Sequence, residues 1–120
     1  MIFSIGNHIE QIINGTKTQT RRLFKGFNKL SYNWFTEYAI QPCRTCKGIS
    51  DGKIKMVDIG FEERGVQITK EDALAEGNYT PEEYEKLFDK MYPGWEWRTV
   101  YRFIFIPNLS LRSSTKEEEV

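Results

Sequence analysis

Residues 99–106 read TVYRFIFI and form the strongest strand signal in the chain. β-Branched and aromatic residues fill this stretch, as is typical of strands, and Pro107 ends it. Two further segments, 38–41 and 53–61, also predict strands, and Gly60 in the second marks a possible bulge. These three segments are therefore expected to be strands.

Three short helices are predicted around these strands. Apolar residues recur at helical spacing over 5–13, and Thr69 is a good N-cap for a helix that reaches Gly77. Thr80, followed by proline, begins the third helix over 80–94. Strands that dominate a small chain with short helices indicate an α+β, mainly β fold. We expect a small β-barrel with peripheral helices, because closure removes exposed edges.

The chain has 120 residues, 39% of them hydrophobic, which fits one domain. Residues 1–107 are assigned to that domain and the polar residues 108–120 to a tail expected to be disordered. No apolar run approaches the ~20 residues of a membrane helix, and the beginning lacks the features of a signal peptide. We therefore predict a cytoplasmic protein without a membrane partner.

The net charge of zero hides an asymmetry. Residues 1–57 carry nine Lys or Arg and three Asp or Glu, whereas residues 58–120 carry eight and fourteen. The stretch 17–29 contains five cations and no acid. A local basic patch can bind phosphate even on a neutral protein, but the acidic half could equally balance it, and the charges alone leave both interpretations open.

The two cysteines, Cys43 and Cys46, form a Cys-x-x-Cys pair. His8 is the only histidine, so one chain cannot supply four Cys or His ligands for zinc. A zinc shared between two chains or a local disulfide remains possible, and we favour two thiols without chemistry. No cofactor and no metal site are predicted.

The segment NGTKTQTRR, residues 14–22, concentrates hydroxyls and cations after a predicted helix end. Its period-two pattern predicts a strand with Thr18, Thr20 and Arg22 on one face. A threonine hydroxyl becomes a nucleophile when a base removes its proton, and a lysine of lowered pKa can be that base. The alternative for Lys17 and Thr20 is surface hydrogen bonding.

Arg21 and Arg22 could each bind phosphate through two parallel hydrogen bonds, although pairing with the acidic second half competes with this interpretation. Aromatic residues beside these cations could stack on unpaired bases, although most such rings in a small domain belong to its core. The aromatic candidates are Phe24, Phe27, Trp34 and Phe35.

The run IINGTKTQTRR resembles the G-x-K-T-x-[T/E]-x-R signature of ASCH domains, relatives of the PUA RNA-binding barrel. The segments ITKEDALAEG, TPEEY and VYRFIF continue the resemblance in family order over about the first 106 residues. It implies a small β-barrel with a cleft beside the first motif. Many members are described as RNA binders, and a ribonuclease activity has been reported for one. Some small bacterial members are N4-acetylcytidine amidohydrolases, whose proposed catalytic Lys, Thr and Glu correspond here to Lys17, Thr20 and Glu76.

Three functions follow as hypotheses. The first is binding of RNA, a nucleoside or a nucleotide, by a chain that is a monomer or a weak dimer. Its binding residues would be Gly15, Thr18, Arg21, Arg22 and Lys25. The second is hydrolysis, either of N4-acetylcytidine through Lys17, Thr20 and Glu76 or of RNA. The third is a protein-interaction module without catalysis. The chain departs from the small amidohydrolases in its longer 23–36 segment, its PCRTC insertion and its tail.

Overall fold

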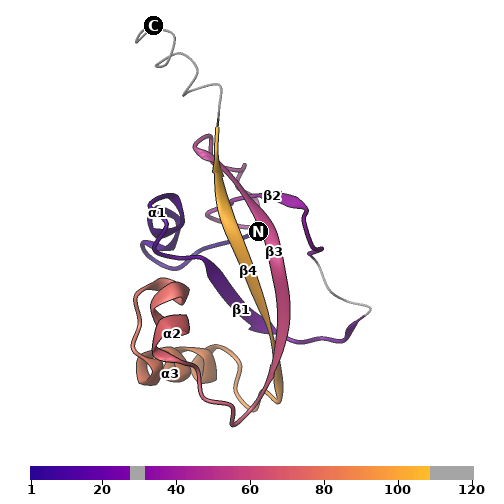
Figure 1. Ribbon diagram of the computed structural model, residues 1–120, viewed down its shortest axis with the longest axis vertical. Helices are drawn as coiled ribbons and strands as arrows, with labels where there is room; N and C mark the ends of the chain where they lie inside the picture. The colour runs from indigo at the N-terminus through magenta and orange to yellow at the C-terminus, as the bar shows by residue number, and fades with distance from the viewer. Residues whose placement is uncertain (28–31, 109–120) are drawn as a thin grey trace, which may run out of the picture.

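The computed structural model describes residues 1–27 and 32–108. The predicted tail therefore lies, except for Asn108, outside the described residues. The elements follow in the order α1 (His8–Ile13), β1 (Gln19–Leu23), β2 (Glu37–Ala39), β3 (Gly52–Glu63), α2 (Lys70–Gly77), α3 (Pro81–Met91) and β4 (Trp97–Pro107). The four strands form one antiparallel sheet in the order β1-β4-β3-β2 (Figure 1). The predicted α+β fold is confirmed.

Strand β4 is the centre of this sheet, because it pairs with β1 on one side and with β3 on the other. Side chains on both of its faces are almost fully buried, among them Val100 on one face and Tyr101 and Phe103 on the other. The stretch with the strongest strand signal is thus the strand that has a partner on both sides, where β-forming side chains pack against both neighbouring strands. Figure 1 shows the long β3–β4 pair running through the molecule, with α2 and α3 beside β1.

The expected closed barrel is wrong, because the sheet is open. Within residues 1–27 and 32–108, β1 and β2 form no ladder with each other. The chain before α1 lies instead beside the segment that follows β2. Ile2 forms a parallel bridge with Gln41, and the Phe3 amide donates to the Gln41 carbonyl at 2.8 Å. A three-residue β2 is too short to carry the ladder that closure would require.

The bulge in β3 lies at Val57, where the register shifts between Met56 and Asp58, and the prediction of a bulge at Gly60 is wrong. The extra residue changes which side chains point inward. Ile54 and Met56 are buried before it, and Ile59 is buried after it. Gly60 pairs regularly with Val100. The buried apolar residues of this strand occupy even-numbered positions before residue 57 and an odd-numbered position after it. The bulge at Val57 brings both sets to the same face of the sheet.

Two hydrophobic clusters form the core. One joins the sheet to α1 and the N-terminal segment, with Phe3, Met56 and Phe103 among its members, and the other packs α2 and α3 around Phe88 and Trp95. Both later helices begin as predicted. Thr69 caps α2 by accepting from the Asp72 amide, and Thr80 forms a capping box with Glu83 at the start of α3.

The cysteine pair forms a disulfide, Cys43–Cys46. The favoured prediction of two free thiols is therefore wrong, and the local disulfide held open as an alternative is what the structure contains. The four-residue CRTC turn brings the two Cα atoms to 5.0 Å, which suits a disulfide. No helix in the described part of the chain has the length and apolar character needed to cross a membrane.

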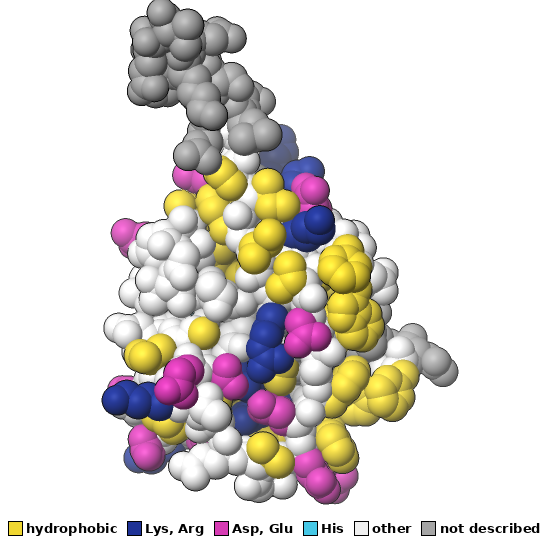
Figure 2. Space-filling view, in the orientation of Figure 1, with side chains coloured by type: hydrophobic (Ala, Val, Ile, Leu, Met, Phe, Trp, Pro, Cys, Tyr) yellow, Lys and Arg dark blue, Asp and Glu magenta, His cyan; other side chains and the backbone are white. Residues whose placement is uncertain are grey.

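Charged side chains of both signs are interspersed on the face shown in Figure 2, and hydrophobic side chains gather along one side of it. The acids of the second half of the sequence therefore balance the cations of the first half locally. Arg21 of the first half illustrates this, because it pairs with Glu62 and with Glu76 of the second half at 2.8 Å each.

Candidate active site

A cavity of about 240 Å³ lies between the two hydrophobic clusters. The segment before α1 contributes Phe3 to its wall, the β1 region contributes Lys17 and Thr20, and the helices contribute Glu76 and Tyr84. The remaining lining residues are Ile2, Ser4, Ile5, His8, Arg21, Arg22, Leu87, Met91 and Tyr92. The cavity thus combines aromatic and aliphatic walls with a buried polar floor, which is the usual character of a small-ligand site.

Lys17 is 2% exposed. Its ammonium donates to the backbone oxygen of Gln19 at 2.9 Å and to that of Glu76 at 2.5 Å. Burial lowers the pKa of Lys17 from 10.5 to about 8; the Glu76 carboxylate opposes this change, and the charges of Arg22 and Arg21 add to it. A substantial fraction of this lysine is consequently neutral slightly above physiological pH, as a general base must be.

Glu76 lies in the last turn of α2 and is 1% exposed. Its Oε2 accepts from Arg21 Nη1 at 2.8 Å, its Oε1 accepts from the Arg21 amide at 3.3 Å, and Lys17 Nζ lies 3.9 Å from Oε1. Burial, together with the charge and hydrogen bond of Glu76, holds the pKa of Tyr84 well above its usual range. Tyr84 therefore stays protonated and donates to this carboxylate.

Arg21 is saturated by protein carboxylates. Its Nε and Nη2 donate to the two oxygens of Glu62 at 2.8 Å each, Nη1 donates to Glu76, and Asp72 lies 3.4 Å from Nη2. The side chain has no exposed surface. The structure thus gives Arg21 a task different from the phosphate contact suggested by the sequence: it fixes the position of Glu76.

Thr20 is 6% exposed and lines the same cavity as Lys17 and Glu76. No other described residue forms a hydrogen bond with its hydroxyl. Of the three residues assigned by resemblance, Lys17 and Glu76 are in direct contact, and Thr20 faces the cavity that they share. Lys17 reaches this cavity although period two placed it on the opposite face from Thr20, because β1 begins only at Gln19.

The predicted binding residues divide into two groups. Arg22 lines the cavity, donates to the Ile2 oxygen at 2.6 Å and lies over the Phe3 ring at 5.6 Å. Gly15, Thr18 and Lys25 are not part of the wall. Gly15 takes the positive φ of 86° that ends the α1 region, and Thr18 exchanges main-chain hydrogen bonds with Ala75 and Phe103.

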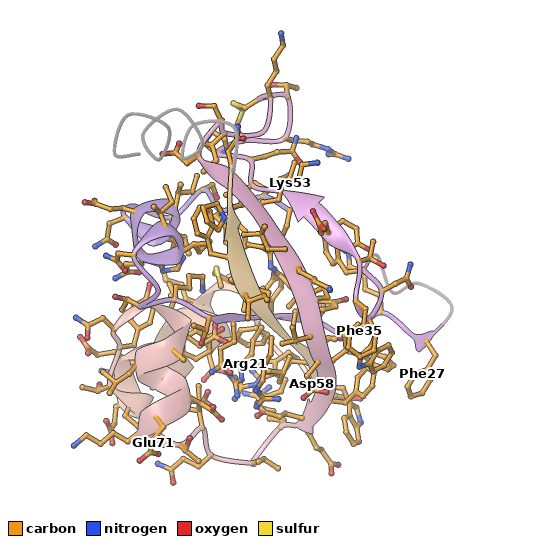
Figure 3. The ribbon with its side chains drawn as sticks, turned by 45° about the horizontal axis from the view of Figure 1, so that its top comes forward. Arg21, Phe27, Phe35, Lys53, Asp58 and Glu71 are labelled. Carbon is orange, nitrogen blue, oxygen red and sulfur yellow. A yellow bond between two sulfur atoms is a disulfide. The ribbon has the colours of Figure 1, made fainter. Side chains whose placement is uncertain are left out.

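The aromatic candidates also lie away from this cavity. Phe27 and Phe35 are 71% and 72% exposed, and Figure 3 shows both to the right of β3, with Arg21 to its left. Phe24 instead packs edge-on against Phe27 and Phe61. The rings that could contact a ligand in the cavity are others, namely those of Phe3, Tyr84 and Tyr92.

Sequence reasoning gave His8 no role beyond counting zinc ligands. It lines the cavity, and its Nε2 lies 2.9 Å from the Tyr79 hydroxyl. Burial, with the charges of Lys17 and Arg22, lowers the pKa of His8 to about 4, so the ring is neutral at pH 7. A Cβ at Gly77 would approach its Nε2 to 2.7 Å, which explains a glycine at the end of α2. No sequence pattern signals this contact between α1 and α2.

Lys17→Met is expected to raise the free energy of unfolding at pH 7 by about 1–2 kcal/mol. A pKa near 8 in place of 10.5 corresponds to roughly 3 kcal/mol of unfavourable burial, and two lost hydrogen bonds return about 1 kcal/mol each. Between pH 8 and 10.5 the unfolded chain binds more protons than the folded one, so wild-type stability rises with pH across this window. Urea unfolding at both ends measures the effect. A strongly destabilised variant at pH 7 would identify Lys17 as a structural residue.

Comparison with solved structures assigns this fold to a known class. The chain is similar to an ASCH domain from Lactobacillus crispatus (TM-score 0.64, 12% identity, 88% of this chain and 77% of that one). It is also similar to protein EF3133 of the family DUF984 from Enterococcus faecalis (0.61, 13%, 88% and 79%). A variant of the ASCH protein of Zymomonas mobilis matches with TM-score 0.55 at 15% identity, over 93% of this chain and 78% of that one.

The chain therefore has the fold of ASCH domains, which is PUA-like, and the expected likeness is confirmed at that level. No protein-family model matches the sequence, and no curated protein matches it. At these identities the likeness shows the fold and leaves the chemistry to be argued from the cavity itself. Among residues 1–27 and 32–108, no three His, Cys, Asp or Glu side chains are grouped as metal ligands.

Proposed function

We propose that the cavity binds a single nucleoside or the nucleoside part of a small ligand. The observation that supports this is the combination of walls: the rings of Phe3 and Tyr84 stand beside the polar groups of Lys17, Thr20 and Glu76. A base offers a flat apolar face and a polar edge, and such a lining can contact both. A volume of about 240 Å³ lies below the range of about 300–1,000 Å³ typical of ligand pockets, and so suits a small ligand.

A long tract of RNA backbone fits this site less well than a nucleoside does. Contacts to many phosphates need cations that are free to approach them. Arg21 is enclosed by carboxylates, and Lys25 lies outside the cavity wall, so Arg22 is the cation at the wall with part of its surface exposed. A ligand in the cavity would consequently form few contacts with phosphate.

Cytidine and N4-acetylcytidine are expected to bind with affinities that change less than about threefold between 50 and 200 mM salt, whereas a ligand with 6–10 phosphate contacts loses about 10³–10⁵. Arg22→Met should weaken binding about tenfold or more, because the ligand loses a hydrogen bond from the charged Arg22 guanidinium. Lys25→Met is the matched control, since Lys25 is exposed and outside the wall. Calorimetric titration measures both. A loss in Lys25→Met with none in Arg22→Met would move the ligand out of the cavity.

We further propose that the same site hydrolyses an amide on the bound base, with N4-acetylcytidine as the expected substrate. A specific observation favours this second function: a buried lysine with a pKa of about 8 contacts Glu76 in a cavity that Thr20 also lines. These are the groups that an activated threonine nucleophile needs.

In this reaction Thr20 Oγ1 attacks the acetyl carbonyl while neutral Lys17 removes its proton. The tetrahedral intermediate carries a negative oxygen, and the Arg22 guanidinium at the cavity wall can stabilise that charge. Collapse of the intermediate breaks the C–N bond, and the proton that Lys17 took from Thr20 passes through Glu76 to the exocyclic amine, which leaves protonated. Water then releases acetate from Thr20. Formation of cytidine and acetate in equal amounts is the measurement, and no turnover of N4-acetylcytidine would reject the hydrolysis while leaving binding to be judged separately.

A further inference from the structure

The Cys43–Cys46 disulfide is accessible and closes a very small loop. Both cysteines are partly exposed, and Arg44 and Lys47 beside them are exposed. A disulfide across so short a loop constrains little of the unfolded chain, so it contributes less to stability than one across a long loop. Accessible sulfur beside cations is instead the environment in which thiolates form and exchange readily. The position of this disulfide therefore suits chemistry more than it suits stabilisation.

A continuous set of hydrogen bonds joins this loop to the wall of the cavity. The Gln41 side-chain amide donates to the Cys46 carbonyl at 2.9 Å. The Gln41 backbone in turn accepts from the Phe3 amide at 2.8 Å and donates to the Met1 carbonyl at 2.9 Å. The segment held in this way places Ile2 and Phe3 in the cavity wall.

The held segment also contacts the charged groups of the site. The Ile2 carbonyl accepts from Arg22 at 2.6 Å, and the Phe3 ring lies 5.6 Å from the Arg22 guanidinium and 5.9 Å from Lys17 Nζ. Displacement of residues 1–3 would thus change the position of Arg22 and the apolar cover of Lys17. Gln41 is the one side chain that links the disulfide loop to this segment through hydrogen bonds that the structure describes.

We propose that Cys43 and Cys46 form a thiol–disulfide exchange site for a low-molecular-weight thiol, and that its redox state controls the order of the cavity wall at residues 1–3. The regulatory half of this proposal rests on the proposed function of the cavity. In the disulfide form the Cys46 carbonyl is fixed and holds Gln41. In the dithiol form the turn is released, Gln41 loses its partner, and the wall loosens.

The exchange is balanced by two equivalents of the external thiol. A thiolate of the reductant attacks one sulfur and forms a mixed disulfide, and the other cysteine leaves as a thiolate. A second external thiol then attacks the mixed disulfide and releases the second cysteine, so that two electrons pass to the protein and the reductant leaves oxidised. When both cysteines end as neutral thiols, their two protons come from the two external thiols.

Thiol titration and amide hydrogen exchange test the proposal on the whole chain. Protein prepared without reductant should show no free thiol, and dithiothreitol should release two. On reduction, exchange of the Phe3 amide should become about 2- to 12-fold faster, the factor expected for one lost hydrogen bond. Two free thiols that oxidised glutathione fails to close, or an unchanged Phe3 amide in the reduced protein, would overturn the proposal.

Two variants distinguish coupling through Gln41, from the disulfide to residues 1–3, from a general loosening of the fold. Cys43→Ser with Cys46→Ser should match the reduced protein and ignore dithiothreitol. Gln41→Met keeps the disulfide but removes the amide donor, so its Phe3 amide should exchange fast in both redox states. A Gln41→Met protein that still responds to reduction would refute the path through Gln41.

Cytidine affinity in the two redox states tests the regulation itself. The affinity should fall about 2- to 12-fold on reduction, in step with the exchange of Phe3. Equal affinity in both states would contradict the regulation. If cytidine binds neither form, the proposed function of the cavity fails, and the thiol and amide measurements alone decide the exchange site and its effect on the wall.

Discussion

Replacing Arg21 by methionine is expected to lower the free energy of unfolding by about 3–5 kcal/mol, the usual cost of breaking a buried ion pair from one side. The guanidinium donates at 2.8 Å to both Glu62 and Glu76 and has no exposed surface. Methionine fills much of the volume but leaves both carboxylates without this counter-charge. Urea denaturation monitored by tryptophan fluorescence measures the loss.

Arg102→Met is the matched control, because it makes the same substitution on the strand adjacent to β1. Arg102 lies opposite Gln19, and its side chain is 37% exposed in its pair with Asp58. An exposed ion pair contributes at most about 1 kcal/mol, so this variant should remain near wild type. Similar losses in the two variants would show that the burial of the Arg21 network is not what stabilises this region.

The Arg21→Met effect should also depend on pH, with a sign set by Glu62. Burial raises the pKa of Glu62, but hydrogen bonds and charges from Arg21 and Arg98 outweigh it and hold the pKa below 4.5. The wild type therefore gains stability from Glu62 above pH 4.5 and loses it as the pH falls through the lower folded-state value. Without Arg21 this contribution falls to the part that Arg98 supplies through its 2.9 Å bond to Glu62, and the gap between variant and wild type should narrow in acid.

The helices were the part of the fold most accessible from sequence, because their signals are local. Thr80 and Glu83 form the capping box within four residues, and Thr69 caps α2 in the same manner. The sequence did not predict that the sheet is open, because closure depends on whether β1 and β2 can form a ladder with each other. That depends on the length of β2 and on where the N-terminal segment lies, which the pattern of neither segment encodes.

The candidate site was accessible only in part, and for a similar reason. The family resemblance gave Lys17, Thr20 and Glu76, and all three line one cavity. The partners that orient them come from distant elements: Glu62 lies 41 residues from Arg21 in sequence. The sequence offered two equally charged arginines, and only the packing decides that Arg21 is enclosed by carboxylates while Arg22 reaches the wall.

Hydrolysis of N4-acetylcytidine should increase with pH through about 8 and level off above it. The reason is that Lys17 acts as a base only when neutral, and burial brings its pKa to about 8. Arg22→Met removes a cation that helps to lower this pKa, so the inflection should move to higher pH in that variant. The measurement is kcat/KM for cytidine release from pH 6 to 10, with the uncatalysed rate subtracted at each pH.

Lys17→Met should lower kcat/KM about 10²–10⁴-fold, the range that a positioned general base contributes. Thr20→Val should abolish turnover because it removes the nucleophile, whereas Thr20→Ser keeps a hydroxyl at the same place and should retain activity. Lys25→Met, outside the cavity, should leave both the rate and the pH profile unchanged. Full turnover in Lys17→Met would exclude this lysine as the base. A Lys17→Met protein that is inactive yet more stable than wild type would mean that the chain retains a buried amine at a cost in stability, which is the expected signature of a catalytic group.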